Sequence, residues 1–341
     1  MNVFEGGVFY ASKIIRMSKI STFCELQRRC RRAYPAFLSE GGHLVNASPL
    51  FKGCATALVT PFLPDGTLDE AALRRLIAIQ LDSQIDALVL LGTTGEPCTL
   101  TMDERKRVIE IGLETANGSL PVIVGTGSNN TRQAIEYARQ AEQLGAQGQL
   151  CVTPYYNKAT QAGLIRHYHA ILESCPLPLI VYNVPSRTGV SLTADTVLRL
   201  NEHPLIAGIK EASGNPVLTA EILAQSQNPI HVYCGNDDQI LPLMSLGACG
   251  AISVVSNVAP AQVHALTAAL LTGDMRSARE KQFELLDLIQ ALFSQVNPIP
   301  VKAALSMMGL IHDSLRLPLT PLEEPYREKL RHALQKLNLI P

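Results

Sequence analysis

The feature that most constrains this chain is a regular alternation between short apolar runs and amphipathic segments. Apolar runs typical of strands begin 20 to 34 residues apart, near Cys54, Ala87, Pro121, Gln149, Leu179, Ile206, His231 and Ala251. Amphipathic helix patterns, such as residues 69–84 and 131–144, fill most of the gaps. Apolar strands that alternate with helices indicate a parallel sheet covered on both faces. Eight such units predict an α/β fold, the TIM (β/α)8 barrel.

The structural alternative is a doubly wound open sheet, but no GxGxxG follows the first run and eight units are many for that fold. Beyond Gly273 the pattern is purely helical, over residues 275–293, 300–308 and 321–337. We therefore expect a barrel at 51–274 and a C-terminal helical domain at 275–341.

Residues 1–50 differ from the remainder in charge, with seven Lys or Arg against three Glu. We interpret this segment as an N-terminal extension, either a disordered tail or an over-extended start. An organelle transit peptide is the alternative, because such peptides are rich in Arg and poor in acidic residues.

Composition excludes several classes of partner. The net charge of -1 gives no case for nucleic acid or an anionic membrane, and no apolar run approaches the roughly 18–20 residues of a membrane span. The eight cysteines form no CxxC, and several lie in apolar runs, so we expect reduced thiols and a cytoplasmic protein. His167 and His169 lie two residues apart in a helix pattern and point in different directions, so no metal is predicted.

A lysine in the sixth apolar run is the strongest candidate for catalysis. The run reads Ile206-Ala-Gly-Ile-Lys-Glu-Ala-Ser-Gly214 and carries Lys210. A buried ammonium is unfavourable unless it is paired or neutral, and Glu211 is a poor partner because adjacent strand residues point to opposite faces. A neutral amine attacks carbonyls, so Lys210 predicts Schiff-base chemistry. A structural ion pair with another carboxylate is the alternative.

Further polar residues follow the runs, where barrel active sites lie. The turn Gly92-Thr-Thr-Gly95 can hold a carboxylate, although ordinary turns use the same residues. Tyr182 can move protons beside Lys210, or it can be a core aromatic; Tyr155-Tyr156 has the same two interpretations. Arg187 suits a substrate carboxylate, or a surface salt bridge.

Together these segments resemble the dihydrodipicolinate synthase family, over about residues 51–339. Gly92-Thr-Thr-Gly-Glu96 and Gly208-Ile-Lys-Glu-Ala-Ser-Gly214 also mark the wider group, which includes N-acetylneuraminate lyase and keto-deoxy-sugar-acid aldolases. More specific to the synthases are Tyr155-Tyr156 after Thr-Pro, Tyr182-Asn-Val-Pro-Ser-Arg-Thr-Gly189 and Asn297-Pro-Ile-Pro-Val-Lys302.

The resemblance implies 4-hydroxy-tetrahydrodipicolinate synthase activity, that of a Schiff-base-forming lyase in the diaminopimelate route to lysine. Pyruvate, bound to Lys210, would condense with L-aspartate-4-semialdehyde without any cofactor. The implied catalytic residues are Lys210, Tyr182, Thr93 and Tyr156, and the implied substrate-binding residues are Thr94, Arg187, Ile252 (by its main chain) and Gly235. The resemblance also implies a homotetramer, a dimer of dimers in which Tyr156 reaches into the neighbouring subunit.

One region departs from the family pattern. Lysine-inhibited relatives use a Ser-Ala pair after the Gly-Glu turn, histidines shortly beyond it and a glutamate further along. The corresponding positions here are Pro97, Cys98, Met102, Arg105 and Gln133, while Asn129 and Tyr155 remain. Without the carboxylate the ammonium of lysine is poorly paired, so we expect weak or absent lysine feedback.

Two alternatives to the synthase remain. The first is another aldolase or lyase of the group, such as N-acetylneuraminate lyase; Arg187 argues against it, since sugar-acid members need hydroxyl-binding residues there. The second is a catalytically silent sensor of keto acids. The intact set of Lys210, Tyr182, Thr93 and Tyr156 argues against a sensor.

Overall fold

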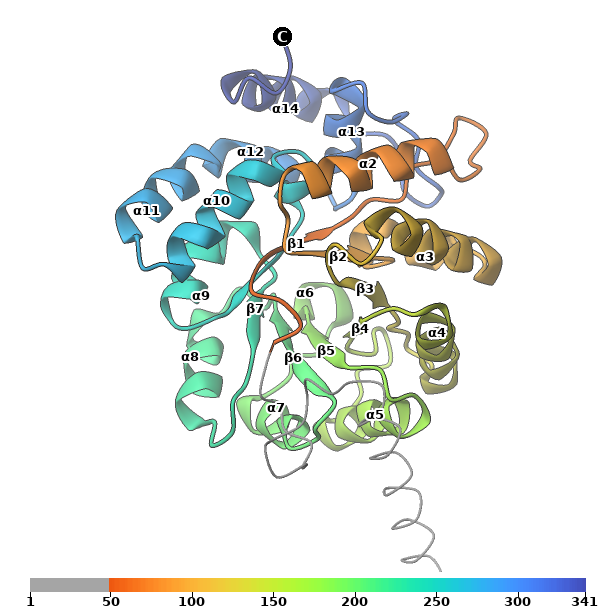
Figure 1. Cartoon of the computed structure of the whole chain (residues 1–341), viewed down its shortest axis with the longest axis vertical. Coiled ribbons are helices and arrows are strands. Elements are labelled where there is room, and N and C mark those ends of the chain that lie inside the picture. The colour runs from red at the N-terminus through yellow and green to blue at the C-terminus, as the bar shows by residue number, and fades with distance from the viewer. Residues whose placement is uncertain (1–48) are drawn as a thin grey trace, which may run out of the picture. The chain divides into compact units, whose positions relative to one another are not determined.

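Eight parallel strands close into a barrel in the computed structural model, which describes residues 49–341 (Figure 1). The strands are β1 (Gly53–Ala57), β2 (Ala87–Leu90), β3 (Val122–Gly125), β4 (Gly148–Val152), β5 (Leu179–Asn183), β6 (Ile206–Glu211), β7 (Val232–Cys234) and β8 (Gly250–Ser253). Each strand pairs with its neighbours in sequence, and β8 pairs with β1. The predicted barrel is confirmed, whereas the interpretation of the N-terminal extension falls almost entirely outside the described residues.

A helix follows every strand and covers the outside of the barrel (Figure 1). These helices are α2 (Glu70–Asp82), α3 (Met102–Ala116), α4 (Thr131–Leu144), α5 (Gln161–Ser174), α7 (Ala194–Asn201), α8 (Pro216–Gln225), α9 (Ile240–Ser245) and α10 (Pro260–Leu271). Side-chain caps fix several starts: Asp69 accepts from the Ala72 amide at 2.9 Å, and Thr101 forms a capping box with Glu104.

Side chains from all eight strands fill the barrel interior. The buried cluster includes Ala55, Val89, Ile123, Leu150, Ile180, Ala207, Tyr233 and Ile252. Near its base the rings of Phe51 and Tyr233 stack with centroids 4.4 Å apart. The Tyr233 hydroxyl donates to the Phe51 carbonyl at 3.1 Å, so the polar end of this core phenol is satisfied. The interior is therefore a packed core, and space for a ligand is left only towards the strand ends.

The C-terminal segment is helical as predicted, but the expected single helix over residues 275–293 is two helices. These are α11 (Met275–Glu284) and α12 (Leu286–Leu292), which α13 (Ile299–Met307) and α14 (Glu324–Lys336) follow. The break at Leu285 lets α11 pack on α10 while α12 packs on α14. The amphipathic periodicity of residues 275–293 alone did not show that the two halves of this segment pack on different helices.

Two further observations concern the described part of the chain. None of its helices is both long and apolar enough to cross a membrane. Its six cysteines, Cys54, Cys98, Cys151, Cys175, Cys234 and Cys249, are all free thiols.

Candidate active site

Lys210 lies near the carboxyl end of β6 with only 5% of its surface exposed. Burial lowers the pKa of its amine to about 8, and the nearby Asp237 carboxylate opposes that shift. Roughly one amine in ten is neutral one unit below its pKa, so an appreciable fraction of Lys210 is unprotonated near neutral pH. The amine can therefore act as a nucleophile without a metal or an added base.

An irregularity in β6 aligns Lys210 with its neighbour. Leu179 pairs with Ile206 but Ile180 pairs with Gly208, so β6 gains one residue against β5. This shift places Lys210, and not Ile209, opposite Tyr182. Gly208 has φ 147°, and a Cβ there would lie 2.3 Å from a carbonyl oxygen, so the irregularity requires glycine.

Tyr182 lies directly beside the lysine amine. The Nζ atom of Lys210 is 4.4 Å from the centroid of the Tyr182 ring. Burial raises the pKa of the Tyr182 phenol, while the Arg187 charge and a hydrogen bond with Thr93 oppose that rise. A protonated phenol joined to a hydroxyl can pass a proton to or from a group on the lysine.

Gly235 makes room for the lysine side chain. A Cβ at this position would lie 3.0 Å from Cε of Lys210 and 2.7 Å from the Cβ of Ala212. A larger residue at the end of β7 would therefore displace Lys210.

The threonines of the Gly92-Thr-Thr-Gly95 turn lie above the barrel in the short 3₁₀ helix η2 (Thr93–Gly95). Thr94 is buried, and its Oγ1 accepts a hydrogen bond from Nδ2 of Asn297 at 2.9 Å. Thr60 donates to the Gly95 carbonyl at 2.7 Å and fixes the turn to the loop after β1.

A buried ion pair anchors this turn to the C-terminal helices. The carboxylate of Glu96 accepts from Nζ of Lys302 at 2.5 Å, and both side chains are almost completely enclosed. The Arg316 amide donates to the second oxygen of Glu96 at 3.2 Å. Both residues lie in motifs singled out from the sequence, but their pairing across 206 positions was not predicted.

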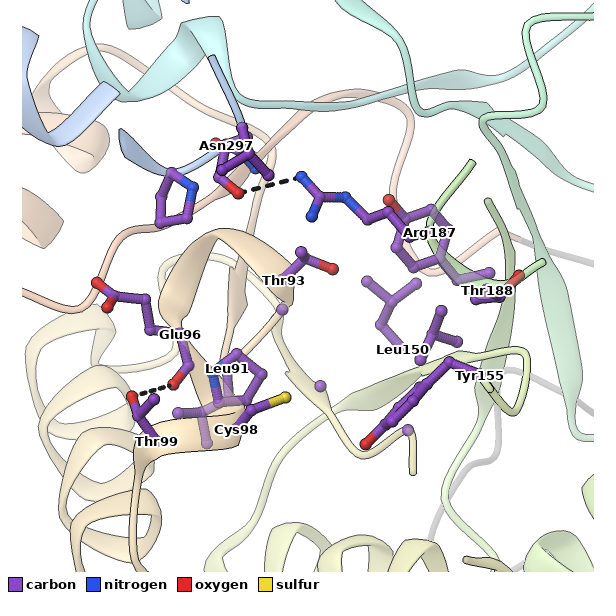
Figure 2. A pocket seen from close by; sticks show the side chains of 18 of the residues that line it. Leu91, Thr93, Glu96, Cys98, Thr99, Leu150, Tyr155, Arg187, Thr188 and Asn297 are labelled. Atoms are coloured by element: carbon purple, nitrogen blue, oxygen red, sulfur yellow. Dashed lines mark hydrogen bonds between the residues drawn. The ribbon is translucent and has the colours of Figure 1, made fainter. Parts of the chain in front are cut away.

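Arg187 reaches the same region from the short helix α6 (Pro185–Thr188). Its Nη2 donates to the Asn297 carbonyl at 3.1 Å, as Figure 2 shows. Asn297 thus contacts Thr94 through its side chain and Arg187 through its main-chain carbonyl, and no individual role was predicted for it.

These side chains line two cavities that have several lining residues in common. The inner cavity, of about 170 Å³, is lined by Thr93, Thr94, Tyr182, Arg187, Lys210, Gly235 and Asn297, among others. The outer cavity, of about 300 Å³, adds Cys98, Tyr155 and Pro318, and it shares Thr93, Tyr182, Arg187 and Asn297 with the inner one (Figure 2). Arg187 thus lines both cavities, whereas Lys210 lines the inner one.

Asp237 is a second buried carboxylate that sequence reasoning did not place in the site. It accepts hydrogen bonds from the Ser253 hydroxyl and from the amides of Val254 at 3.0 Å and Val255 at 3.4 Å. Desolvation raises its pKa, while those donors and Lys210 lower it. Desolvation outweighs these donors, so the pKa of Asp237 is raised overall; when ionised, its carboxylate can balance positive charge on Lys210.

Two of the predicted residues lie elsewhere. Tyr156 is 86% exposed and lines neither cavity of its own chain. Ile252 is fully buried in the barrel core, and the cavity is lined instead by Val254, two residues further on.

The described residues contain no group of three potential metal ligands. His167 is instead within hydrogen-bonding distance of the Thr131 hydroxyl at 3.0 Å, and burial lowers its pKa to about 4.

The closed barrel carries a desolvated lysine at its strand ends, with a phenol beside it and an arginine on the lining of the same cavity. This arrangement defines the site of a Schiff-base-forming enzyme. The family model that describes the dihydrodipicolinate synthetase family matches residues 50–337 of this sequence. A 4-hydroxy-tetrahydrodipicolinate synthase from Exiguobacterium sp. is 50% identical over 291 residues, which cover 85% of this chain and 99% of the relative. The chain belongs to the dihydrodipicolinate synthetase family.

Solved structures agree with this assignment. The dihydrodipicolinate synthase from Thermotoga maritima is 44% identical, with a TM-score of 0.84 over 85% of this chain and all of that one. A structure described as a monomeric dihydrodipicolinate synthase variant is also 44% identical, with a TM-score of 0.84 over 85% of this chain and 98% of that one.

Proposed function

We propose that the protein is a 4-hydroxy-tetrahydrodipicolinate synthase, which condenses pyruvate with L-aspartate-4-semialdehyde and releases one water. The observation that carries this proposal is the buried Lys210 amine, with a pKa of about 8, held beside Tyr182 at the strand ends. Family membership over nearly all the described chain supports the choice of reaction.

In the proposed mechanism, the neutral Lys210 amine adds to the pyruvate carbonyl and water leaves, which gives a protonated imine. The imine withdraws electrons, so a proton can leave the methyl group and an enamine forms. The enamine carbon attacks the semialdehyde carbonyl. The amine of the semialdehyde then attacks the imine carbon, closes the ring and releases Lys210.

Proton transfers in this scheme pass through hydroxyls. Tyr182 is the general acid and base, and its hydrogen bond with Thr93 provides the first link of a relay. Thr94, with the main chain near Ile252, would bind the pyruvate carboxylate. Arg187, which lines both cavities, would bind the carboxylate of the incoming semialdehyde.

The relay also requires Tyr156, which we propose comes from a second subunit of a homotetramer built from two dimers. Its large exposure in one chain supports this assignment. The free thiols of the described cysteines support a reducing compartment, and we propose the cytoplasm.

The decisive test supplies the purified protein with pyruvate plus aspartate semialdehyde and, separately, with N-acetylneuraminate. We expect turnover of the first pair only. Cleavage of N-acetylneuraminate would assign a different lyase of the group. Absence of turnover with either substrate, in a protein that still binds pyruvate, would favour a sensor of keto acids.

A further inference from the structure

A single residue of the C-terminal segment, Asn297, connects the two proposed carboxylate-binding residues, Thr94 through its side chain and Arg187 through its main-chain carbonyl. Asn297 donates from Nδ2 to Oγ1 of Thr94, which lies 203 positions earlier, and its carbonyl accepts from Arg187, 110 positions earlier. Asn297 is 7% exposed and lines both cavities. Figure 2 shows it beside Arg187 at the outer cavity.

The direction of the Asn297–Thr94 hydrogen bond determines what Thr94 can do. A hydroxyl has one proton, and because Oγ1 already accepts from the amide, that proton remains available for another partner. Among the described residues no acceptor takes it, and Thr94 lines the inner cavity. Thr94 is therefore left as a donor to an anion in that cavity.

The orientation of the amide is the favourable one. Its oxygen makes no hydrogen bond within the described chain. Turning the amide over would instead leave the nitrogen unpaired, and buried unpaired N–H groups are rarer than unpaired carbonyls.

The backbone around Asn297 is fixed independently of any substrate. The Lys302 amide donates to the Pro298 carbonyl at 3.1 Å, at the start of α13. The Lys302 side chain in turn binds Glu96, two residues beyond Thr94. The segments that carry Asn297 and Thr94 are thus joined twice, by the hydrogen bond between these residues and by the Glu96–Lys302 ion pair.

From this geometry we propose that Asn297 is a positioning residue that makes Thr94 an obligatory hydrogen-bond donor to the carboxylate of the keto acid, while its main-chain carbonyl holds Nη2 of Arg187. The inference rests on the proposed function, because it assumes that pyruvate binds in the inner cavity. Asn297 itself need not touch the reacting atoms.

The test measures borohydride trapping of pyruvate against pyruvate concentration, together with steady-state kinetics. Asn297→Ala should raise the half-saturating pyruvate concentration about tenfold, as expected for the loss of one hydrogen-bonding arrangement to a charged group. The KM for the semialdehyde should change less than about twofold, since the main-chain carbonyl of residue 297, which accepts from Arg187, remains in the alanine variant. Asn228→Ala, an exposed asparagine far from the site, is the matched control and should leave both values unchanged.

Two double variants separate positioning from other effects. In a Thr94→Val background, Asn297→Ala should add nothing further to the pyruvate half-saturation. Asn297→Asp should weaken pyruvate binding more than Asn297→Ala, because a carboxylate would take the Thr94 proton and would also repel the pyruvate anion, and Thr94→Val should reduce this difference without abolishing it. Since Asp has nearly the shape of Asn, this variant carries the test if the alanine variant does not fold.

The outcomes distinguish the inference from the proposed function. If the unaltered protein traps pyruvate and Asn297→Ala binds it equally well, the role of Asn297 is refuted and the proposed function stands. Additive effects of the Asn297 and Thr94 substitutions would also refute it. If the unaltered protein traps no pyruvate on Lys210, the proposed function itself fails.

Discussion

At the residue scale, the site depends on a lysine kept in an environment that does not favour its charge. The Lys210 amine is enclosed, and the charge that compensates it most is Asp237, whose own oxygens accept other hydrogen bonds. The lowered pKa of about 8 makes the Lys210 amine reactive. The same desolvation destabilises the folded protein at every pH at which the amine is protonated.

Lys210→Met should therefore abolish pyruvate trapping and raise the free energy of unfolding at pH 7 by on the order of 1–3 kcal/mol. The folded pKa lies below that of an unfolded lysine, so the unfolded chain binds more protons between pH 8 and 10.5. Stability of the unaltered protein should rise with pH across this window, and Lys210→Met should remove that rise. Urea unfolding at several pH values measures both effects.

The exposed Lys52→Met serves as the control and should change neither quantity. A Lys210→Met variant less stable than the parent at pH 7 would show that the buried amine is paired and charged.

The chemistry-bearing residues were largely predictable one at a time. Lys210 and Tyr182 stand out because each is a polar group in an apolar strand pattern. Asn297 and Asp237 gave no such signal, since a carboxamide before a proline and an aspartate after a strand are common loop residues. Their roles come from contacts with Thr94 and Ser253 that no local pattern encodes.

At the element scale, the barrel and the C-terminal helices share the site. The loop after β2 carries Thr93 and Thr94, and the Glu96–Lys302 pair ties this loop to α13. Lys302 also lies 4.2 Å from the centroid of the Phe62 ring, so aromatic and charged contacts both hold it. The geometry of the substrate pocket is consequently set by a helix outside the barrel.

Lys302→Met should destabilise the fold by about 3–5 kcal/mol, because it leaves the Glu96 carboxylate buried without its cation. Adding Glu96→Gln should recover part of that loss, since the double variant buries no charge at this place. Chemical denaturation of the three variants measures the coupling. The exposed pair Lys336–Asp287 has the same 2.5 Å separation, so Lys336→Met provides a control that should cost less than about 1 kcal/mol.

If Lys302→Met and Lys336→Met lower the free energy of unfolding equally, the fold does not depend on Lys302 to compensate the buried Glu96 carboxylate.

Strand positions were well predicted because the runs are mainly apolar, as parallel strands buried on both faces are, even where one run carries Lys210. The extra residue in β6 was not predicted, although it decides which side chain faces Tyr182. A one-residue shift depends on how Gly208 meets the backbone of the next strand, which sequence periodicity does not record.

At the scale of the whole molecule, one chain does not complete the proposed relay. Tyr156 has a positive φ of 74° and is almost fully exposed, so its side chain projects away from its own cavity. A second copy of the chain is the proposed source of the missing phenol.

Tyr156→Phe should reduce kcat by about tenfold or more while pyruvate still forms its adduct on Lys210, because proton transfer needs the hydroxyl and imine formation needs the amine. Steady-state rates and borohydride trapping on the same preparation separate these two effects. Full turnover in this variant would remove Tyr156 from the relay.

Lysine should inhibit the enzyme weakly or not at all. The guanidinium of Arg105 is buried, stacks 3.8 Å from the centroid of the Tyr137 ring and donates to the Gly125 carbonyl at 2.7 Å. The resemblance to lysine-inhibited members of the family implies a histidine of their lysine site near this position, and a cation there would repel the ammonium of lysine. Turnover should be unchanged by sub-millimolar lysine, and inhibition in that range would contradict the expectation.

The proposed chemistry depends on a covalent imine between Lys210 and pyruvate, and this imine is detected most directly by its reduction followed by peptide mapping. Purified protein is incubated with pyruvate and borohydride, digested, and analysed by mass spectrometry. We predict a single modified peptide with the reduced adduct on Lys210, and none when pyruvate is omitted. A pyruvate-dependent adduct on a different lysine, or the absence of any adduct in active protein, would rule out Lys210 as the lysine that forms the imine.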